Sequence, residues 1–188
     1  MHRNDLIQKL SEYVPGDVRD AQACAQILEF VRKNPRCFDR SLSIGHVTGS
    51  AWLLDARKEC VLLTLHARFG KWLQLGGHAD GNPNVVEVAL REAREESGID
   101  EIAVLSSKIF DLDVHEIPAR PDTPAHFHYD VRFLMQAAGD RRFHVSNESA
   151  DLAWVPFAGI AQLETDESVR RMCAKWLALA ALAAPSGS

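Results

Sequence analysis

The first 40 residues carry a helical spacing of apolar positions. Apolar side chains recur at intervals of three and four over residues 3–13 and 18–33, and Pro15 and Gly16 separate the two stretches. This spacing places apolar residues along one side of a helix, and proline and glycine are typical of helix ends. The pattern predicts a helical extension over residues 1–40 that packs on the main body of the protein.

The later positions indicate strands around one central helix. Apolar and β-branched runs between charged turn segments are typical of strands. They predict strands at residues 46–55, 60–67, 71–75, 102–114, 127–136 and 152–155. Helices are expected from about 83 to 97, near 157–164 and near 167–183. Strands interrupted by a central helix and closed by C-terminal helices favour a layered α/β fold over residues 41–184. Residues 185–188 are expected to form a disordered tail.

Composition and charge restrict the partners. The chain has 188 residues, enough for one domain with a buried core. Its formal net charge of -5 argues against binding a nucleic acid polymer through a general basic field. No apolar stretch approaches the ~20 residues of a membrane span, and the N-terminus lacks the apolar segment of a signal peptide. The cysteines have no metal-type spacing and indicate thiols in a reducing compartment: Cys24, Cys37, Cys60 and Cys173. We therefore expect a cytoplasmic protein without a membrane partner.

The segment GGHADGNPNVVEVALREAREESGI, residues 76–99, contains the central helix and its end signals. Asn82 is a suitable N-cap, and Pro83 suits the first helical position, where a missing N–H costs nothing. Gly98 suits a left-handed position after the last turn. At ~100° per residue, one side of this helix is apolar and is the predicted core face. It comprises Val86, Ala89, Leu90 and Ala93.

Glu92, Glu95 and Glu96 gather on roughly the opposite side of the same helix, where like charges repel. One interpretation is a solvated face on which Arg91 pairs with acids four positions away. The double glycine just before the helix favours a second interpretation, because glycine lets the backbone approach a ligand closely. Clustered carboxylates beside such a turn suit hard divalent cations, which take oxygen ligands.

This segment resembles the Nudix box: a glycine, five residues, a glutamate, seven residues, then arginine-glutamate-aliphatic-any-glutamate-glutamate-any-glycine-aliphatic. Gly77 fills the first position and REAREESGI, residues 91–99, fills the second block, with Ala93 as a small substitute for the aliphatic. The clear departure is Pro83 where the family usually has glutamate. The flanks agree, since ADLAWVPFAGIAQL, residues 150–163, is similar to the family's late strand, tryptophan and final helix. The resemblance implies an α/β/α sandwich on a mixed sheet, here with an N-terminal helical extension.

The resemblance also implies roles for the box residues. Glu95 and Glu96 would be ligands of Mg²⁺ or Mn²⁺, and Glu92 a further ligand or a group that supports them. Arg91 would pair with a glutamate and orient it, and the Gly77 carbonyl would complete the metal shell. A metal ion so placed neutralises phosphate oxygens and lowers the pKa of an attacking water. The catalytic group is thus expected to contain Glu92, Glu95 and Arg91.

Many family members place a general base on a loop outside the box. Glu148 lies just before the predicted late strand and is the best candidate here. The alternative interpretation of Glu148 is a surface loop acid.

A second unusual region is residues 114–133. His126 and His128 alternate and would share one face of a strand with Asp130 and Arg132. In a substrate pocket Arg132 would contact phosphate and a histidine would contact a base or sugar. Alternatively the two histidines join His115 in a transition-metal site, or the strand faces solvent.

The remaining histidines are less informative. His78 follows the double glycine and either points into the site or serves as a turn residue. His46 and His66 give no signal beyond ordinary core or surface histidines.

We interpret the chain as a metal-dependent pyrophosphohydrolase that cleaves a nucleoside diphosphate derivative, such as a nucleotide or nucleotide sugar. Two alternatives stay open: a Nudix-fold sensor that binds a nucleotide without cleaving it, and a diphosphate isomerase with Cys60 in its proton-transfer pair. The intact glutamate block argues against the sensor. Dimers are common in the family, so the resemblance allows a homodimer.

Overall fold

The protein is a seven-stranded mixed sheet with helices on both faces. The computed structural model describes residues 2–67, 69–139, 143 and 149–183. The helices are α1 (Asn4–Glu12), α2 (Val18–Lys33), α3 (Val85–Ser97), the 3-10 helix η1 (Phe157–Gln162) and α4 (Glu167–Ala183). The strands are β1 (Gly45–Leu54), β2 (Cys60–His66), β3 (Lys71–His78), β4 (Ile102–Val104), β5 (Asp111–Ile117), β6 (His126–Ala137) and β7 (Ser149–Pro156). This confirms the predicted α/β/α sandwich.

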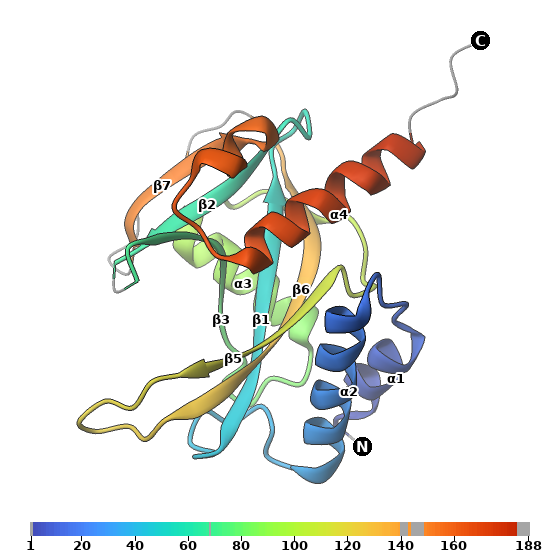
Figure 1. Ribbon diagram of the computed structural model, residues 1–188, viewed down its shortest axis with the longest axis vertical. Coiled ribbons are helices and arrows are strands. Elements are labelled where there is room, and N and C mark those ends of the chain that lie inside the picture. Colours follow the sequence, from blue (N-terminus) through green and yellow to red (C-terminus); the bar gives the residue numbers. More distant parts are fainter. Residues whose placement is uncertain (1, 68, 140–142, 144–148, 184–188) are drawn as a thin grey trace.

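The sheet has the order β4-β6-β1-β3-β2-β7, with β5 paired to β6. The central β1–β6 pair is parallel, and the other pairs are antiparallel. Because side chains alternate along a strand, each strand contributes to both faces. Odd-numbered positions of β1 and β6 face a core shared with α1, α2 and α3. At the C-terminal end of β1, the even-numbered residues Trp52 and Leu54 lie on the second face of the sheet and pack with η1 and α4. Figure 1 shows α4 in front of β1 and α3 behind it.

The N-terminal helices belong to the same core as the sheet. Leu6 and Leu10 of α1 and Ile27 of α2 are buried in the cluster that contains Val47 of β1. Phe30 of α2 also stacks on Tyr129 of β6 with ring centroids 3.8 Å apart. The extension is therefore part of the packed body. The expected tail at 185–188 lies outside the described residues.

Three boundaries predicted from the sequence were wrong. The strand expected at 102–114 is two strands, because Ser106 accepts a hydrogen bond from the Lys108 amide at 3.0 Å and forms a turn between them. The helix expected near 157–164 is present as η1, but it is a 3-10 helix that ends at Gln162. The N-cap of α3 is Asn84 and not Asn82: the Asn82 side chain instead accepts from the Asn84 amide at 2.9 Å, which delays the helix.

Other local predictions are confirmed. Gly98 has φ 67° and ends α3 in the left-handed conformation. The helices predicted over 18–33 and 167–183 have the observed bounds of α2 and α4. All four cysteines are buried and none is in a disulfide. Among the described residues, no helix is both long and apolar enough to cross a membrane.

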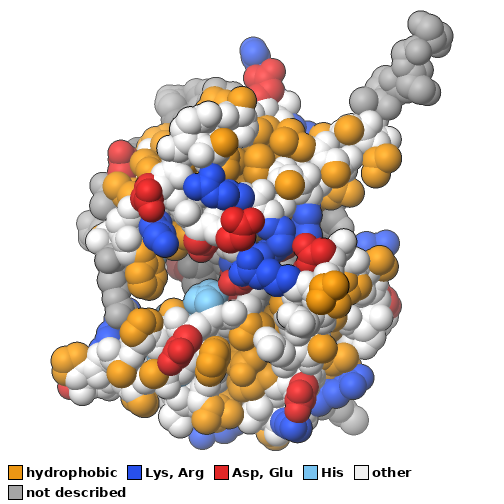
Figure 2. Space-filling model, viewed as in Figure 1, with side chains coloured by type: hydrophobic (Ala, Val, Ile, Leu, Met, Phe, Trp, Pro, Cys, Tyr) orange, Lys and Arg blue, Asp and Glu red, His pale blue; other side chains and the backbone are white. Residues whose placement is uncertain are grey.

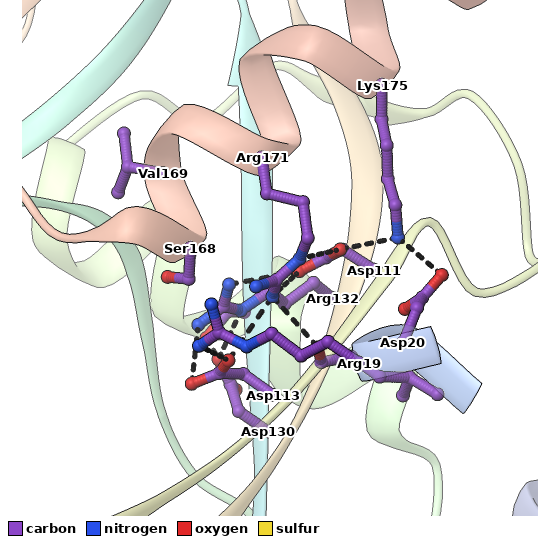
Figure 3. A network of polar contacts seen from close by, with 12 residues as sticks. Arg19, Asp20, Asp111, Asp113, Asp130, Arg132, Ser168, Val169, Arg171 and Lys175 are labelled. Atoms are coloured by element: carbon purple, nitrogen blue, oxygen red, sulfur yellow. Dashed lines mark hydrogen bonds and ion pairs between the residues drawn. The ribbon is translucent and has the colours of Figure 1, made fainter. Parts of the chain in front are cut away.

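A buried network of charges joins the layers (Figure 3). Its centre is Asp111 of β5, which is fully buried and accepts hydrogen bonds from three cations. Arg132 of β6 donates to it at 3.1 Å, Arg171 of α4 at 2.8 and 3.0 Å, and Lys175 of α4 at 2.6 Å. Lys175 also donates to Asp20 of α2 at 2.9 Å. One carboxylate thus links the sheet to helices from both ends of the chain.

We expect Asp111→Asn to lower the free energy of unfolding by about 3–5 kcal/mol, because it leaves buried cations without their counter-charge. Urea unfolding at neutral pH measures the change. The control is Glu29→Gln, which removes an exposed acid paired with Lys33 one helical turn away and should change little. A loss for Asp111→Asn no larger than the ~1 kcal/mol of a surface pair would contradict this account.

Candidate active site

A cavity of about 1040 Å³ opens on the face of the sheet that α4 partly covers. Its floor is made by even-numbered residues of β1, β3 and β6, such as Thr48, Gln74 and Asp130. One side is bordered by the glutamates of α3, and another by the hairpin between β5 and β6. Figure 2 shows this face hollowed between the hairpin and α4, with a histidine at the edge of the hollow. The volume is at the upper end of the range for small-molecule sites.

Helix α3 lies unusually close to the sheet. A Cβ atom on Gly49 of β1 would be 2.9 Å from the Val85 carbonyl oxygen and 3.1 Å from the Ala89 amide nitrogen. Both contacts are to helix backbone, so only glycine fits at this position without a shift of α3. The consequence is that Val85 and Val88 are buried.

The predicted core face of α3 was therefore partly wrong. Ala89 and Ala93 are buried, but Val86 and Leu90 are only half-buried. Val85 and Val88, which were not part of the predicted core face, are buried and pack against Gly49. The same rotation of the helix turns the glutamates toward the cavity.

Glu92, Glu95 and Glu96 all line the cavity. The Glu92 side chain is only 16% exposed, Glu96 is half-buried and Glu95 is exposed. A Cβ atom on Gly77 would lie 2.5 Å from Glu92 Oε2 and 2.6 Å from its carboxyl carbon, so the glycine provides the space that this carboxylate occupies. These oxygen donors on adjoining turns form a set that suits a hard divalent cation.

Arg91 holds the Glu92 carboxylate and the end of β3. Its Nη2 donates to Glu92 Oε1 at 2.6 Å and to the His78 carbonyl oxygen at 2.7 Å. This differs from the pairing four positions away that the charge pattern alone suggested. Arg91 bonds its immediate neighbour because Glu92 lies against Gly77 and His78 follows Gly77 on the same strand.

The predicted row of polar residues on β6 does share one face. His128 and Asp130 line the cavity with His126 at its mouth. Arg132 is 1% exposed, and its positive charge is paired with carboxylates. Its Nε donates to Asp130 at 2.7 Å and its Nη1 to Asp111 at 3.1 Å. Asp130 also accepts from the Thr48 and Ser50 hydroxyls at 2.8 Å. Arg132 thus holds Asp130 in the floor of the cavity, and its bonds to these carboxylates argue against the predicted contact with phosphate.

Asp113 and His115 of β5 form the side of the floor. The His115 Nδ1 and Asp113 Oδ2 atoms are 3.1 Å apart. Burial is the largest influence on Asp113 and opposes its ionisation. Even so, the hydrogen bond with His115 and the charges of Arg132, His115 and Arg171 together hold the pKa of Asp113 well below its ordinary value. This carboxylate is therefore a fixed negative charge of the network at neutral pH.

His46 lines the cavity as well, which its position in the sequence did not indicate. The parallel register pairs His46 of β1 with His128 of β6, and His78 of β3 pairs with Thr48, two residues along β1. The His46 ring centroid is 4.9 Å from both the His78 and the His128 centroids. Only the pairing of strands far apart in the sequence brings these rings together. The spacing of histidines within each segment could not have revealed it.

Burial keeps two of these rings neutral. Desolvation, followed by the neighbouring imidazoles His78 and His126, lowers the pKa of His46 to about 4. Desolvation and the surrounding histidines lower the pKa of His128 to about 2. Neutral imidazoles present nitrogen lone pairs to the cavity, which is the form that binds metals.

Two further predicted residues are not found among those that line the cavity, for different reasons. Glu148, the candidate general base, lies outside the described residues. Cys60, the cysteine considered for an isomerase, is buried at the start of β2 and does not line the cavity.

Comparison with known proteins gives the family. A family model described as NUDIX domain matches residues 46–177. The chain therefore belongs to the Nudix family of hydrolases, and α1 and α2 precede the matched region. A comparison with curated proteins finds no significant match.

Solved structures agree on the fold. The chain is similar to a Nudix hydrolase from M. smegmatis, RenU, at 20% identity and a TM-score of 0.55, over 77% of this chain and 91% of that one. It is similar to a MutT protein from Methanosarcina mazei Go1 at 18% identity and a TM-score of 0.58, over 74% and 97% of the two chains. The E. coli dihydroneopterin triphosphate pyrophosphohydrolase gives 16% identity and a TM-score of 0.54, over 71% and 95%.

The close packing of α3 can be tested at Gly49. We expect Gly49→Ala to destabilise the protein by about 1–3 kcal/mol, the range for overpacked cores, because the added methyl group meets helix backbone. Denaturant unfolding measures this loss. Gly159→Ala is the matched control, since a Cβ there would meet only Val155 Cγ1 at an ordinary 3.8 Å. Equal stability of the two variants would show that α3 does not need the space at Gly49.

Proposed function

We propose that this protein hydrolyses a pyrophosphate linkage in a nucleoside diphosphate derivative with the help of Mg²⁺ or Mn²⁺. The observation that carries the proposal is the common cavity of Glu92, Glu95 and Glu96, on a helix with the family's box. Three carboxylates that border one cavity repel one another until a cation neutralises them. A divalent ion bound there would polarise phosphate oxygens and activate water.

The residues of the chain have distinct tasks in this proposal. Glu95 and Glu96 hold the metal ion, and Glu92 adds a ligand or positions the other two. The Gly77 carbonyl is a further candidate ligand. Arg91 keeps the Glu92 carboxylate in place through its bonds to Glu92 and to the His78 carbonyl. Glu148, which directly precedes β7 in the sequence, is proposed as the general base.

The cavity also supplies groups that suit an anionic substrate. Lys71 and Arg120 line it, and they offset the acidic net charge of the chain where the phosphates would bind. His78, His126 and His128 are the proposed contacts for the base or sugar. Arg132 is left out of the phosphate contacts here, because its guanidinium is enclosed by Asp111 and Asp130.

The structure bears differently on the two alternative functions. A nucleotide sensor does not need the carboxylates, so their presence at the cavity favours an enzyme. An isomerase with Cys60 as proton donor needs that thiol at the cavity, and it lies elsewhere. Hydrolysis is therefore the function that the site supports best.

A substrate screen tests the proposal. Nucleoside triphosphates, nucleotide sugars, dinucleoside polyphosphates and coenzyme A are incubated with the protein and Mg²⁺ or Mn²⁺. The nucleotide products are separated by anion-exchange chromatography and quantified by their absorbance. We expect turnover of one compound class by the wild type and a loss of about 10²–10³-fold in Glu95→Gln, the scale for losing one main electrostatic group.

The matched control is Glu87→Gln, the same substitution on the exposed side of α3, outside the cavity lining. It should keep wild-type turnover. Equal activity of wild type and Glu95→Gln would contradict the role of Glu95. No turnover by any variant, with nucleotide binding still measurable, would favour the sensor.

A further inference from the structure

Three imidazoles from three strands converge at one end of the sheet. His46 lies at the start of β1, His78 at the end of β3 and His128 near the start of β6. One ring nitrogen of each lies within 4.8 Å of the others. All three residues line the same cavity as the carboxylates of α3, but they offer nitrogen ligands where α3 offers oxygen ligands.

His46 is buried in a way that is costly without a ligand. Its side chain is 2% exposed, and neither ring nitrogen has a hydrogen-bond partner among the described residues. The Nε2 atom of His128 is also buried without a partner in that part of the chain. A buried polar group without a partner costs about 1–3 kcal/mol, so the fold bears this cost at two adjacent rings.

We propose that His46, His78 and His128 form a binding site for a transition-metal ion of the Zn²⁺ class, distinct from the carboxylate site on α3. Imidazole nitrogen suits Zn²⁺ and its neighbours in the first transition row, whereas Mg²⁺ and Mn²⁺ prefer oxygen. Zinc–nitrogen bonds of about 2.0–2.1 Å put tetrahedral ligand atoms about 3.4 Å apart, which small ring rotations reach from the observed spacing.

The ligand set differs from the one that the sequence suggested. His115 and His126 already use a ring nitrogen, with Asp113 at 3.1 Å and with the Pro124 carbonyl at 2.9 Å. They surround His128 with ring centroids 5.4 Å away and complete the histidine-rich wall. Arg91 fixes the backbone of His78, so the metal site and the glutamates share a support.

Three protein ligands leave one position of a tetrahedral ion open. Because all three histidines line the cavity, that position faces it. The chemical class of ligand it takes is an anionic or water oxygen. A cavity with an oxygen-ligated cation on one side and a nitrogen-ligated cation on another can hold a polyanion at two points.

Direct metal titration tests this proposal without any substrate. Tag-free protein is freed of metals with EDTA and titrated with Zn²⁺ by calorimetry and with Co²⁺ by visible absorption. We expect one Zn²⁺ per chain and intense Co²⁺ bands from a site with nitrogen ligands. His46→Asn and His128→Asn should each weaken Zn²⁺ binding by about 100-fold or more, since loss of even a supporting group costs about 10–100-fold.

Controls separate the two sites and the fold. His78→Asn tests the same site in a second variant. Because His78 is only half-buried, this variant should fold even if His46→Asn does not. Unfolding in EDTA verifies that each variant is folded. His2→Asn, which removes a histidine bonded to the Pro35 carbonyl at 3.0 Å, should keep wild-type binding. Glu95→Gln should keep it too. Unchanged Zn²⁺ affinity in folded His78→Asn and His128→Asn, or a loss only in Glu95→Gln, would overturn the proposal.

Discussion

Arg132 carries its charge into the interior of the protein, and much of the architecture follows from neutralising it. The network around it is buried except at Arg19, and it sets four carboxylates against four cations: Asp20, Asp111, Asp113 and Asp130 against Arg19, Arg132, Arg171 and Lys175. Buried ion pairs add little net stability, but an unmatched buried charge is costly. The network therefore fixes which packing is allowed: α4, α2, β5 and β6 must meet in one arrangement.

The same arrangement forms the floor of the cavity. Asp130 belongs to the network and also accepts hydrogen bonds from Thr48 and Ser50 of β1. His128 and His126 occupy the next positions on the same face of β6, toward the start of that strand. On the other face, Gly49 lets α3 approach so closely that its glutamates turn toward the cavity edge at Gly77. Charge matching on one face and glycine on the other thus help to bring imidazoles and carboxylates to the same cavity.

The local elements were predictable and the site was only partly so. Helices α2 and α4 and the left-handed end of α3 follow from periodicity and end signals within each segment, and the box marked Glu92, Glu95 and Glu96. The orientation of α3 was not predictable, because it depends on Gly49, more than 30 residues upstream. The proposed role of His46 depends on its pairing with His128 in the parallel register of β1 and β6. Residues paired in this register are 82 positions apart in the sequence, as Thr48 and Asp130 are. Such contacts leave no periodic signal in the chain.

In the proposed hydrolysis, the carboxylates of α3 hold the divalent ion. The most direct measurement is anomalous diffraction at the manganese edge from crystals grown with Mn²⁺. We expect a peak bordered by the carboxylates of Glu92, Glu95 and Glu96, beside Gly77, as this assignment requires. A fully occupied Mn²⁺ peak at the histidines alone, with none at α3, would contradict it.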